Sequence, residues 1–295
     1  MDDLVANLLA AYRVSIEALD WMSEETKQRA FTKLEKFTPK IGYPKTFRDY
    51  SALTVVRGDL LANVQAASVF ETDRQLDKLG GPVDRDEWHM LPQTVNAYYN
   101  PGTNEICFPA GILQKPFFSP EATLAENYGG IGAVIGHEIG HGFDDQGSQY
   151  DGDGNMENWW TDADRAAFEV KTKALIEQYD GFELRDLPGE KVNGQLTVGE
   201  NIGDLGGLTI AYKAFLIAHP EATDDEKRSL FLNWSYVWRG KRRPEQLQQL
   251  LAVDPHSPAE FRANIVRNLH EFHELFATSE SDALWLAPEA RVGIW

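Results

Sequence analysis

The sequence is nearly free of cysteine, since Cys107 is the only one among 295 residues. A single thiol cannot form an intrachain disulfide, so covalent cross-links cannot hold this chain together. A chain of this length buries most of the surface that its unfolded form exposes, and it therefore needs no such cross-link. Protein without disulfides is typical of a reducing compartment, and we expect a cytoplasmic location.

Positive charge is also scarce, with 28 Lys and Arg against 46 Asp and Glu and a net charge of −18. This acidic balance repels nucleic acid and anionic membranes, so we expect no nucleic-acid partner. No apolar run approaches the roughly 20 residues that cross a bilayer, and the first residues lack the basic start of a signal peptide. We therefore expect a soluble chain without a membrane segment.

Helical periodicity is abundant. Leu4, Leu8, Tyr12 and Ile16 recur at helical spacing near the start. A second helix is predicted to begin after Ser23 as its N-cap and to end before Thr38-Pro39, because proline disfavours helix in the residue before it. The same reasoning predicts further helices over residues 59–79, 124–144, 162–179, 198–217 and 226–238.

Strand-forming residues cluster in only one region. Residues 94–99 and 105–108 are rich in β-formers, and the five residues between them, Asn100-Pro101-Gly102-Thr103-Asn104, are turn formers. This pattern predicts a β-hairpin. The chain is therefore predicted to be a helix-rich α+β protein with one short sheet.

The segment His137-Glu138-Ile139-Gly140-His141 carries the first chemical signal. Residues four apart on a helix lie on one face, about 5–6 Å apart, so both imidazoles can bind one zinc ion. The glutamate between them can reach a water on the open position of the metal and accept its proton.

The alternative is a helix with two histidines that are solvated or satisfied within the core. Ile131, Val134 and Ile135 precede the motif and indicate that this helix is largely buried. Buried imidazoles and a buried carboxylate need partners, which favours the metal site.

Glu200 and Asp204 carry the second signal, within the segment from Gly199 to Gly207. A catalytic zinc site needs a third protein ligand, and Glu200 is a candidate. Asp204 shares its helical face and could accept a hydrogen bond from the free ring nitrogen of a liganding histidine. The alternative is a helix start with an acidic first turn, which would be favoured if the histidine pair were absent.

The third signal is the predicted strand from Val95 to Tyr99. An edge strand beside a metal cleft can hold an extended peptide by main-chain pairing, and the Asn96 amide could add hydrogen bonds. Judged by these residues alone, a plain hairpin strand is the preferred interpretation.

Taken together, these motifs resemble the neprilysin-like metallopeptidases, which include the bacterial endopeptidase O group. The resemblance extends over nearly the whole chain. It rests on residues 96–99, 106–114, 116–118, 127–132, 137–145, 199–204, 256–258 and 261–262.

The resemblance implies a zincin-like, thermolysin-type peptidase domain with one Zn²⁺ per chain. His137 and His141 match the zinc histidines of the family, Glu200 matches the third ligand, and Glu138 matches the catalytic glutamate. Zinc would activate a water for attack on the peptide carbonyl without a covalent intermediate.

Four further matches imply roles around the metal. Asp204 matches the aspartate that orients the first histidine and is often assigned as proton donor, and Asp144 matches the one that supports the second histidine. His256 matches the histidine that stabilises the oxyanion. Arg262 matches the arginine that holds a substrate carbonyl.

The resemblance also implies a substrate site for oligopeptides. Asn96 and Ala97 match the positions that bind the substrate backbone. Family members tend to cut before bulky hydrophobic residues. The family has an apolar pocket for the residue after the scissile bond. Its positions correspond in this chain to Ile112, Phe117, Val134, Val237 and Trp238.

Two departures from the family pattern affect these expectations. Arg239 stands where mammalian members have a cysteine, and the end near Trp295 lacks another, which indicates a bacterial-type member. Family members are also longer. We expect one catalytic domain over residues 1–295, with a helical lead-in at 1–85 and a zinc-binding core at 86–295, and without the family's N-terminal lid.

Two alternative functions stay open. A truncated chain could bind zinc and a peptide without cutting. An aminopeptidase is the other alternative, but it would need a site for a free substrate amine, and the sequence offers no clear candidate.

Overall fold

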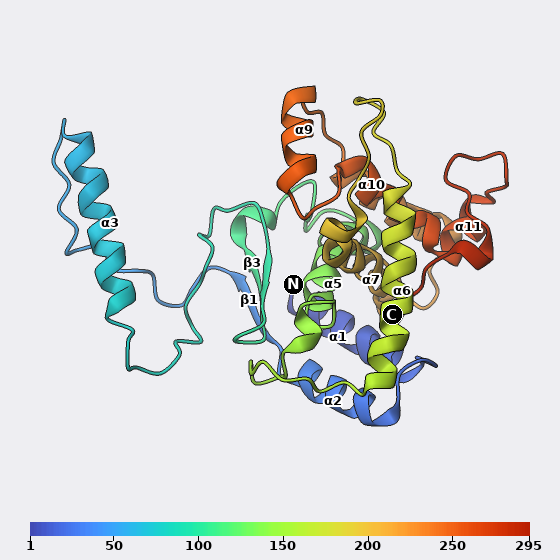
Figure 1. Ribbon diagram of the computed structural model, residues 1–295, viewed down its shortest axis with the longest axis horizontal. Coiled ribbons are helices and arrows are strands. Elements are labelled where there is room, and N and C mark those ends of the chain that lie inside the picture. The colour runs from blue at the N-terminus through green and yellow to red at the C-terminus, as the bar shows by residue number, and fades with distance from the viewer.

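A computed structural model describes residues 1–295. One long helix, α7 (Gly194–Ala218), runs through the centre of the helical body and is buried over most of its length (Figure 1). It packs against α1 (Asp2–Glu17), α5 (Ala133–Gly140) and α6 (Asp162–Asp180). The helix-rich α+β class predicted from the sequence is confirmed.

The N-terminal helices are joined to the body by buried polar contacts. Ser23 caps α2 (Glu24–Glu35), as predicted, by accepting a hydrogen bond from the Thr26 backbone. The Asp164 carboxylate in the first turn of α6 accepts hydrogen bonds from the Ser23 hydroxyl (2.6 Å) and from Thr26 and Thr161. One buried carboxylate therefore binds the starts of two helices together.

The sheet has three strands in the order β1-β3-β2. Central strand β3 (Glu105–Pro109) is completely buried; β2 (Tyr98–Asn100) pairs with it antiparallel, as the hairpin predicted. The predicted first strand was too long, because the ladder begins only at Tyr98. The parallel partner β1 (Thr38–Gly42) was not predicted, since its pairing with a strand 67 residues further along the chain has no local signal.

The predicted helix over residues 124–144 is wrong in detail. The structure has α4 (Leu124–Asn127), then one π-helical turn at Tyr128–Gly132, then α5. A Cβ atom on Gly129 would lie 2.0 Å from the Leu230 carbonyl oxygen, and one on Gly130 would lie 2.3 Å from that of Phe117. Because these backbones approach so closely, tertiary contacts determine the helix geometry here.

Further helices complete the C-terminal part. Helix α8 (Asp224–Val237) starts two residues before its predicted start, behind a capping box formed by Thr223 and Glu226. Helix α7 starts four residues before the predicted position, capped by Asn193. Three helices were not predicted: α9 (Pro244–Val253), α10 (Ala259–Ala263) and α11 (His270–Phe276).

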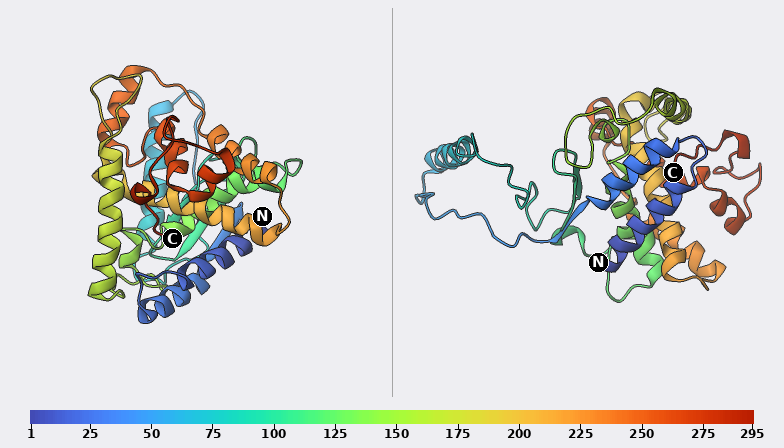
Figure 2. Two further views of the ribbon diagram at one scale, coloured as in Figure 1. Left: turned by 90° about the vertical axis from the view of Figure 1, so that its right-hand side faces the viewer. Right: turned by 90° about the horizontal axis from the view of Figure 1, so that it is seen from below.

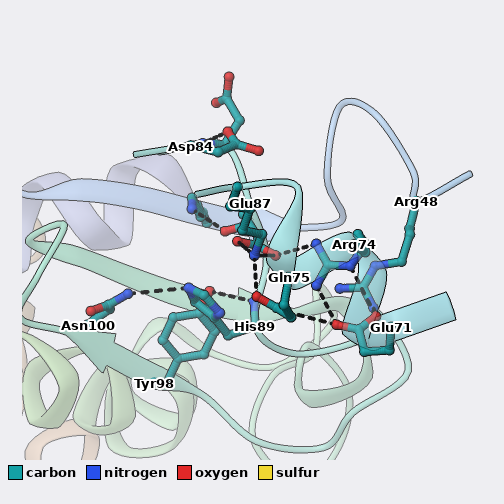
Figure 3. Close-up of polar contacts among 12 residues, drawn as sticks. Arg48, Glu71, Arg74, Gln75, Asp84, Glu87, His89, Tyr98 and Asn100 are labelled. Carbon is teal, nitrogen blue, oxygen red and sulfur yellow. Dashed lines mark hydrogen bonds and ion pairs between the residues drawn. The ribbon is translucent and has the colours of Figure 1, made fainter. Parts of the chain in front are cut away.

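Residues 43–91 form an arm that stands away from the body and carries α3 (Leu60–Leu76), the helix predicted over 59–79 (Figures 1 and 2). No residue of α3 is buried. Figure 3 shows the polar contacts at the base of the arm. The Glu87 carboxylate binds Arg74 (2.8 Å) and Lys78 (2.7 Å), and Lys40 donates to the Glu87 carbonyl.

None of the helices combines the length and the apolar character that crossing a bilayer requires.

Candidate metal centre

The two histidines of the motif lie one turn apart at the C-terminal end of α5. His137 is buried and His141 caps the helix, and their rings are 4.5 Å apart between centroids. Both rings face α7. The two helices meet closely, because a Cβ atom on Gly203 would lie 2.8 Å from the His137 ring. Glycine at this position therefore lets the α5 imidazole lie directly against α7.

Glu200 reaches the same point from α7. Its carboxylate oxygens lie 3.1 Å from His137 Nε2 and 3.8 Å from His141 Nε2. One atom from each of the three side chains falls within 4.8 Å of the others. Two imidazoles and a carboxylate that converge in this way match the ligand set of a catalytic zinc site, which keeps a further position for water.

The chemistry of the three donors fits a metal ion. Glu200 Oε2 is buried without a hydrogen bond, although His137 Nε2 and His256 Nε2 each lie 3.1 Å away. A buried carboxylate oxygen without a hydrogen-bond partner is costly unless a cation compensates it. The residues present therefore fit a divalent cation bound among them.

Each of the two imidazoles is held by a further carboxylate, in addition to Glu200. His137 Nδ1 lies 3.0 Å from Asp204 Oδ1, and His141 Nδ1 lies 2.7 Å from Asp144 Oδ2. These contacts leave both Nε2 atoms directed at Glu200 and set the tautomer that binds a metal. Asp144 is itself fixed, because its other oxygen accepts the backbone N–H of Gly147 at 2.7 Å.

The electrostatics of the centre match its geometry. Burial disfavours a charged ring, but the Asp204 and Glu200 carboxylates raise the pKa of His137 to about 10. Burial acts against ionisation of Glu200 as well, yet His137 and His256 hold the pKa of that carboxyl far below its usual range. The site thus keeps anionic oxygen beside protonated imidazole, and a bound cation takes the place of those protons.

Glu138 occupies a different position from the ligands. It is buried, and burial raises the pKa of its carboxyl above the usual value, against the pull of His137 and His141. A carboxyl group whose pKa is raised is better matched to accept and return a proton near neutral pH.

A cavity of about 340 Å³ opens beside the centre and contains His137 and Glu138 among its lining residues. Its lining residues come from the segment before β2, from α5, α7, α8, α9 and α10, and from the segments that connect them. The residues from the sequence analysis that line it are Asn96, Ile112, Phe117, Val134, Asp204, Trp238, His256 and Arg262. Ala97 is buried and Val237 packs against the core, and neither lines this cavity.

The segment that carries His256 is anchored to α7. Ser257 Oγ donates a buried hydrogen bond of 2.7 Å to Asn201 Oδ1. The Asp254 carboxylate lies 2.8 Å from His256 Nδ1 and also accepts the His256 backbone N–H. The Glu200 carboxylate, whose Oε2 lies 3.1 Å from Nε2, raises the pKa of His256 together with Asp254, although burial acts against it.

Arg262 is already engaged by a carboxylate. Its Nε and Nη2 atoms donate to the two oxygens of Asp204, both at 2.7 Å, and its guanidinium stacks on Trp238 at 3.8 Å. The bidentate pair and the stacking fix the arginine at the cavity wall. Only Nη1 has no hydrogen bond to this aspartate.

Comparison with known proteins agrees with this geometry. The sequence pattern of peptidase family M13 matches residues 96–292, and a second pattern of the same family matches residues 1–44. The chain belongs to peptidase family M13. The helix-rich body, the small sheet and the His-Glu cluster agree with the zincin-like class predicted from the sequence.

Individual M13 relatives are close in sequence and structure. The chain is 42% identical over 294 residues to a neutral endopeptidase of Lactococcus lactis, covering 99% of this chain and 46% of that protein. It is 36% identical over 313 residues to human neprilysin, covering 100% and 42%. A crystal structure of the Mycobacterium tuberculosis zinc metalloprotease Zmp1 with an inhibitor matches at a TM-score of 0.97 and 57% identity, covering 100% and 46%. The chain spans less than half the length of these relatives.

Several residues of the M13 site were missed by the sequence analysis. Asp254 stands two residues before His256, a spacing that permits the observed turn and could have signalled it. The α9 residues Leu247, Leu250 and Leu251 also line the cavity, and so does Arg242. The three leucines were missed because the helix that carries them, α9, was not predicted.

Proposed function

We propose that this chain is the catalytic part of a zinc-dependent endopeptidase that hydrolyses oligopeptides and prefers to cut before hydrophobic residues. The observation that carries the proposal is the convergence of His137, His141 and Glu200, with Glu138 beside them at a cavity. Zinc held by these three residues would supply a Lewis acid that lowers the pKa of a water to about 7 and polarises the scissile carbonyl.

Glu138 has the position and the acidity of a general base. Its carboxylate takes a proton from the attacking water and returns it to the leaving amine, as the raised pKa favours. Asp204 holds His137 in the tautomer that binds metal, and Asp144 does the same for His141.

His256 and Arg262 are suited to the charge that develops on the carbonyl oxygen. The raised pKa of His256 favours an imidazolium, which donates from Nδ1 to Asp254 and from Nε2 toward the oxyanion. Arg262 Nη1 remains as a donor for a substrate carbonyl, because the other atoms of the fork bind Asp204.

The cavity supports the preference for hydrophobic residues. Ile112, Phe117, Val134 and Trp238 give it an apolar wall next to Glu138. Asn96 lies at its edge, just before the edge strand β2, where its amide can bind an extended peptide backbone. Ala97 and Val237 stay predicted substrate contacts outside this lining.

Replacing Glu138 by glutamine tests the proposal. The amide keeps the shape of the side chain but cannot accept the proton, so hydrolysis of an N-blocked peptide should fall by roughly 10²–10⁴-fold. Zinc content, measured by atomic absorption, should stay near one ion per chain, because Glu138 is not among the three converging donors.

Glu177→Gln is the matched control, since Glu177 is an exposed residue of α6 far from the cavity. This variant should keep both zinc and activity. Full activity in Glu138→Gln would show that the assigned base is wrong. Zinc binding without any hydrolysis by the unmodified chain would favour a peptide-binding module instead.

A further inference from the structure

Every basic side chain along the cavity except Arg242 lies within ion-pair distance of a carboxylate, including His137 beside Asp204. Arg262 pairs with Asp204 at 2.7 Å, and His256 lies 2.8 Å from Asp254. Arg242 also lines the cavity but is different, because no carboxylate oxygen lies within 4.0 Å of its guanidinium nitrogens, the limit for an ion pair. It is an exposed cation that lines the cavity without a partner.

Arg242 belongs to a short cationic run between α8 and α9. Arg239, Lys241, Arg242 and Arg243 are all exposed, and none of them forms an ion pair. This concentration of positive charge stands out in a chain whose net charge is −18. Of the four side chains, only that of Arg242 lines the cavity.

The cavity that Arg242 lines is partly apolar. Leu247, Leu250 and Leu251 of α9 line the same cavity as Trp238. A guanidinium beside a low-dielectric wall interacts more strongly with an opposite charge than it would in open water. Its planar fork of donors also suits a carboxylate better than a carbonyl.

One carboxylate of the chain, Asp254, lies in the same cavity and feels the charge of Arg242. It pairs with His256 instead, because its Oδ1 atom accepts hydrogen bonds from the ring Nδ1 and the backbone N–H of His256, and neither of its oxygens lies within 4.0 Å of an Arg242 nitrogen. Arg242 is therefore left for a group that the substrate brings.

We propose that Arg242 determines substrate specificity by binding a carboxylate on the C-terminal side of the scissile bond. The inference rests on the proposed function, which places the residue after that bond against Trp238 and its apolar neighbours in the same cavity. The carboxylate is either an acidic side chain or the free C-terminus of a short peptide.

The test compares blocked peptides that share a hydrophobic residue after the scissile bond. Three of them are amidated and carry Glu, Gln or Lys at the next position, and a fourth carries Gln with a free C-terminal acid. For the unmodified chain, kcat/KM should be roughly two- to fivefold higher for Glu, or for the free acid, than for the amidated Gln peptide. This preference should shrink as salt is added.

Two variants locate the effect. Arg242→Gln should abolish the preference, and Arg242→Glu should reverse it in favour of Lys. Lys241→Gln is the matched control. It removes the same charge from the neighbouring residue, whose side chain does not line the cavity. A response to Glu alone identifies a side-chain carboxylate, and a response to the free acid alone identifies the terminus. Both responses support the proposal.

If the kcat/KM preference is unchanged in both Arg242 variants, the proposal is overturned. It is also overturned if Lys241→Gln loses the preference to the same extent, because the effect would then come from the net positive charge of the run rather than from Arg242. The dissociation constants of the same peptides are also measured on the zinc-loaded Glu138→Gln chain, with and without Arg242→Gln. If no peptide is cut, the proposed function fails, and the ratio of these dissociation constants still tests Arg242.

Discussion

At the scale of single residues, Lys33 connects α2 with the loop that follows α5. Its side chain is 1% exposed, and its Nζ donates to the carbonyls of Gly147 (2.7 Å) and Tyr150 (2.6 Å). The backbone N–H of Gly147 in turn binds Asp144, which holds His141. One buried amine thus supports the loop that orients a candidate ligand.

This burial has a consequence for stability. Burial lowers the pKa of Lys33 from 10.5 to about 7, although Asp144 and Asp151 act in the opposite direction. Between these two values the unfolded chain binds more protons than the folded one, so this residue makes stability rise with pH above about 7.

Lys33→Met should therefore flatten the dependence of the unfolding free energy on pH. The slope that disappears is at most about 1.4 kcal/mol per pH unit, measured by urea unfolding at several pH values between 7 and 10. Lys36→Met is the control, because Lys36 is exposed and pairs with Asp153 on the surface. Equal slopes in the wild-type chain and Lys33→Met would contradict this account.

At the scale of elements, the centre depends on the close contact between α5 and α7. A Cβ atom on Gly207 would lie 2.5 Å from the Ala133 carbonyl oxygen and 2.6 Å from the His137 backbone nitrogen. One on Gly136 would lie 2.7 Å from the Gly207 carbonyl oxygen. Small residues on both helices thus allow the imidazoles of one helix to meet the carboxylate of the other.

Gly207→Ala should separate the two helices. Overpacking of this kind costs about 1–3 kcal/mol, which exceeds the roughly 1 kcal/mol that alanine gains over glycine in a helix. Both the urea midpoint and the zinc affinity should fall, since His137 moves with its helix. Gly240→Ala is the control, because nothing lies within 4 Å of its added Cβ atom. Unchanged zinc affinity in Gly207→Ala would contradict the link.

At the scale of the whole molecule, the centre joins segments that are far apart in the sequence. Its donors come from α5 and α7, and the segment of His256 closes the site through Ser257 and Asn201. A cation bound by the folded chain alone must stabilise the fold, because the three donors do not converge in the unfolded chain.

Zinc at about 100 times its dissociation constant should add about 2.7 kcal/mol and raise Tm by roughly 4 °C. Calorimetry with zinc and with a chelator measures this difference. His141→Ala should abolish it, whereas His270→Ala should retain it, because His270 is exposed and contacts Glu274 and Arg291 rather than the three converging donors. A zinc-dependent Tm in His141→Ala would show that the ion binds elsewhere.

Much of this protein was determined by the sequence alone, because the signals are local. The spacing of His137 and His141 follows from one helical turn, and the predicted cap at Ser23 marks the observed start of α2. The hairpin between residues 98 and 109 follows from its turn residues. Family motifs of ordered residues then linked these segments to one another.

Only the tertiary structure decided the remaining features. It placed Asp254 against His256, turned Arg262 onto Asp204, brought β1 beside β3 and left Arg242 unpaired on the cavity wall. None of these contacts has a period or a spacing along the chain. They arise because packing around α7 brings distant segments together, and local propensity carries no information about which partner a side chain meets.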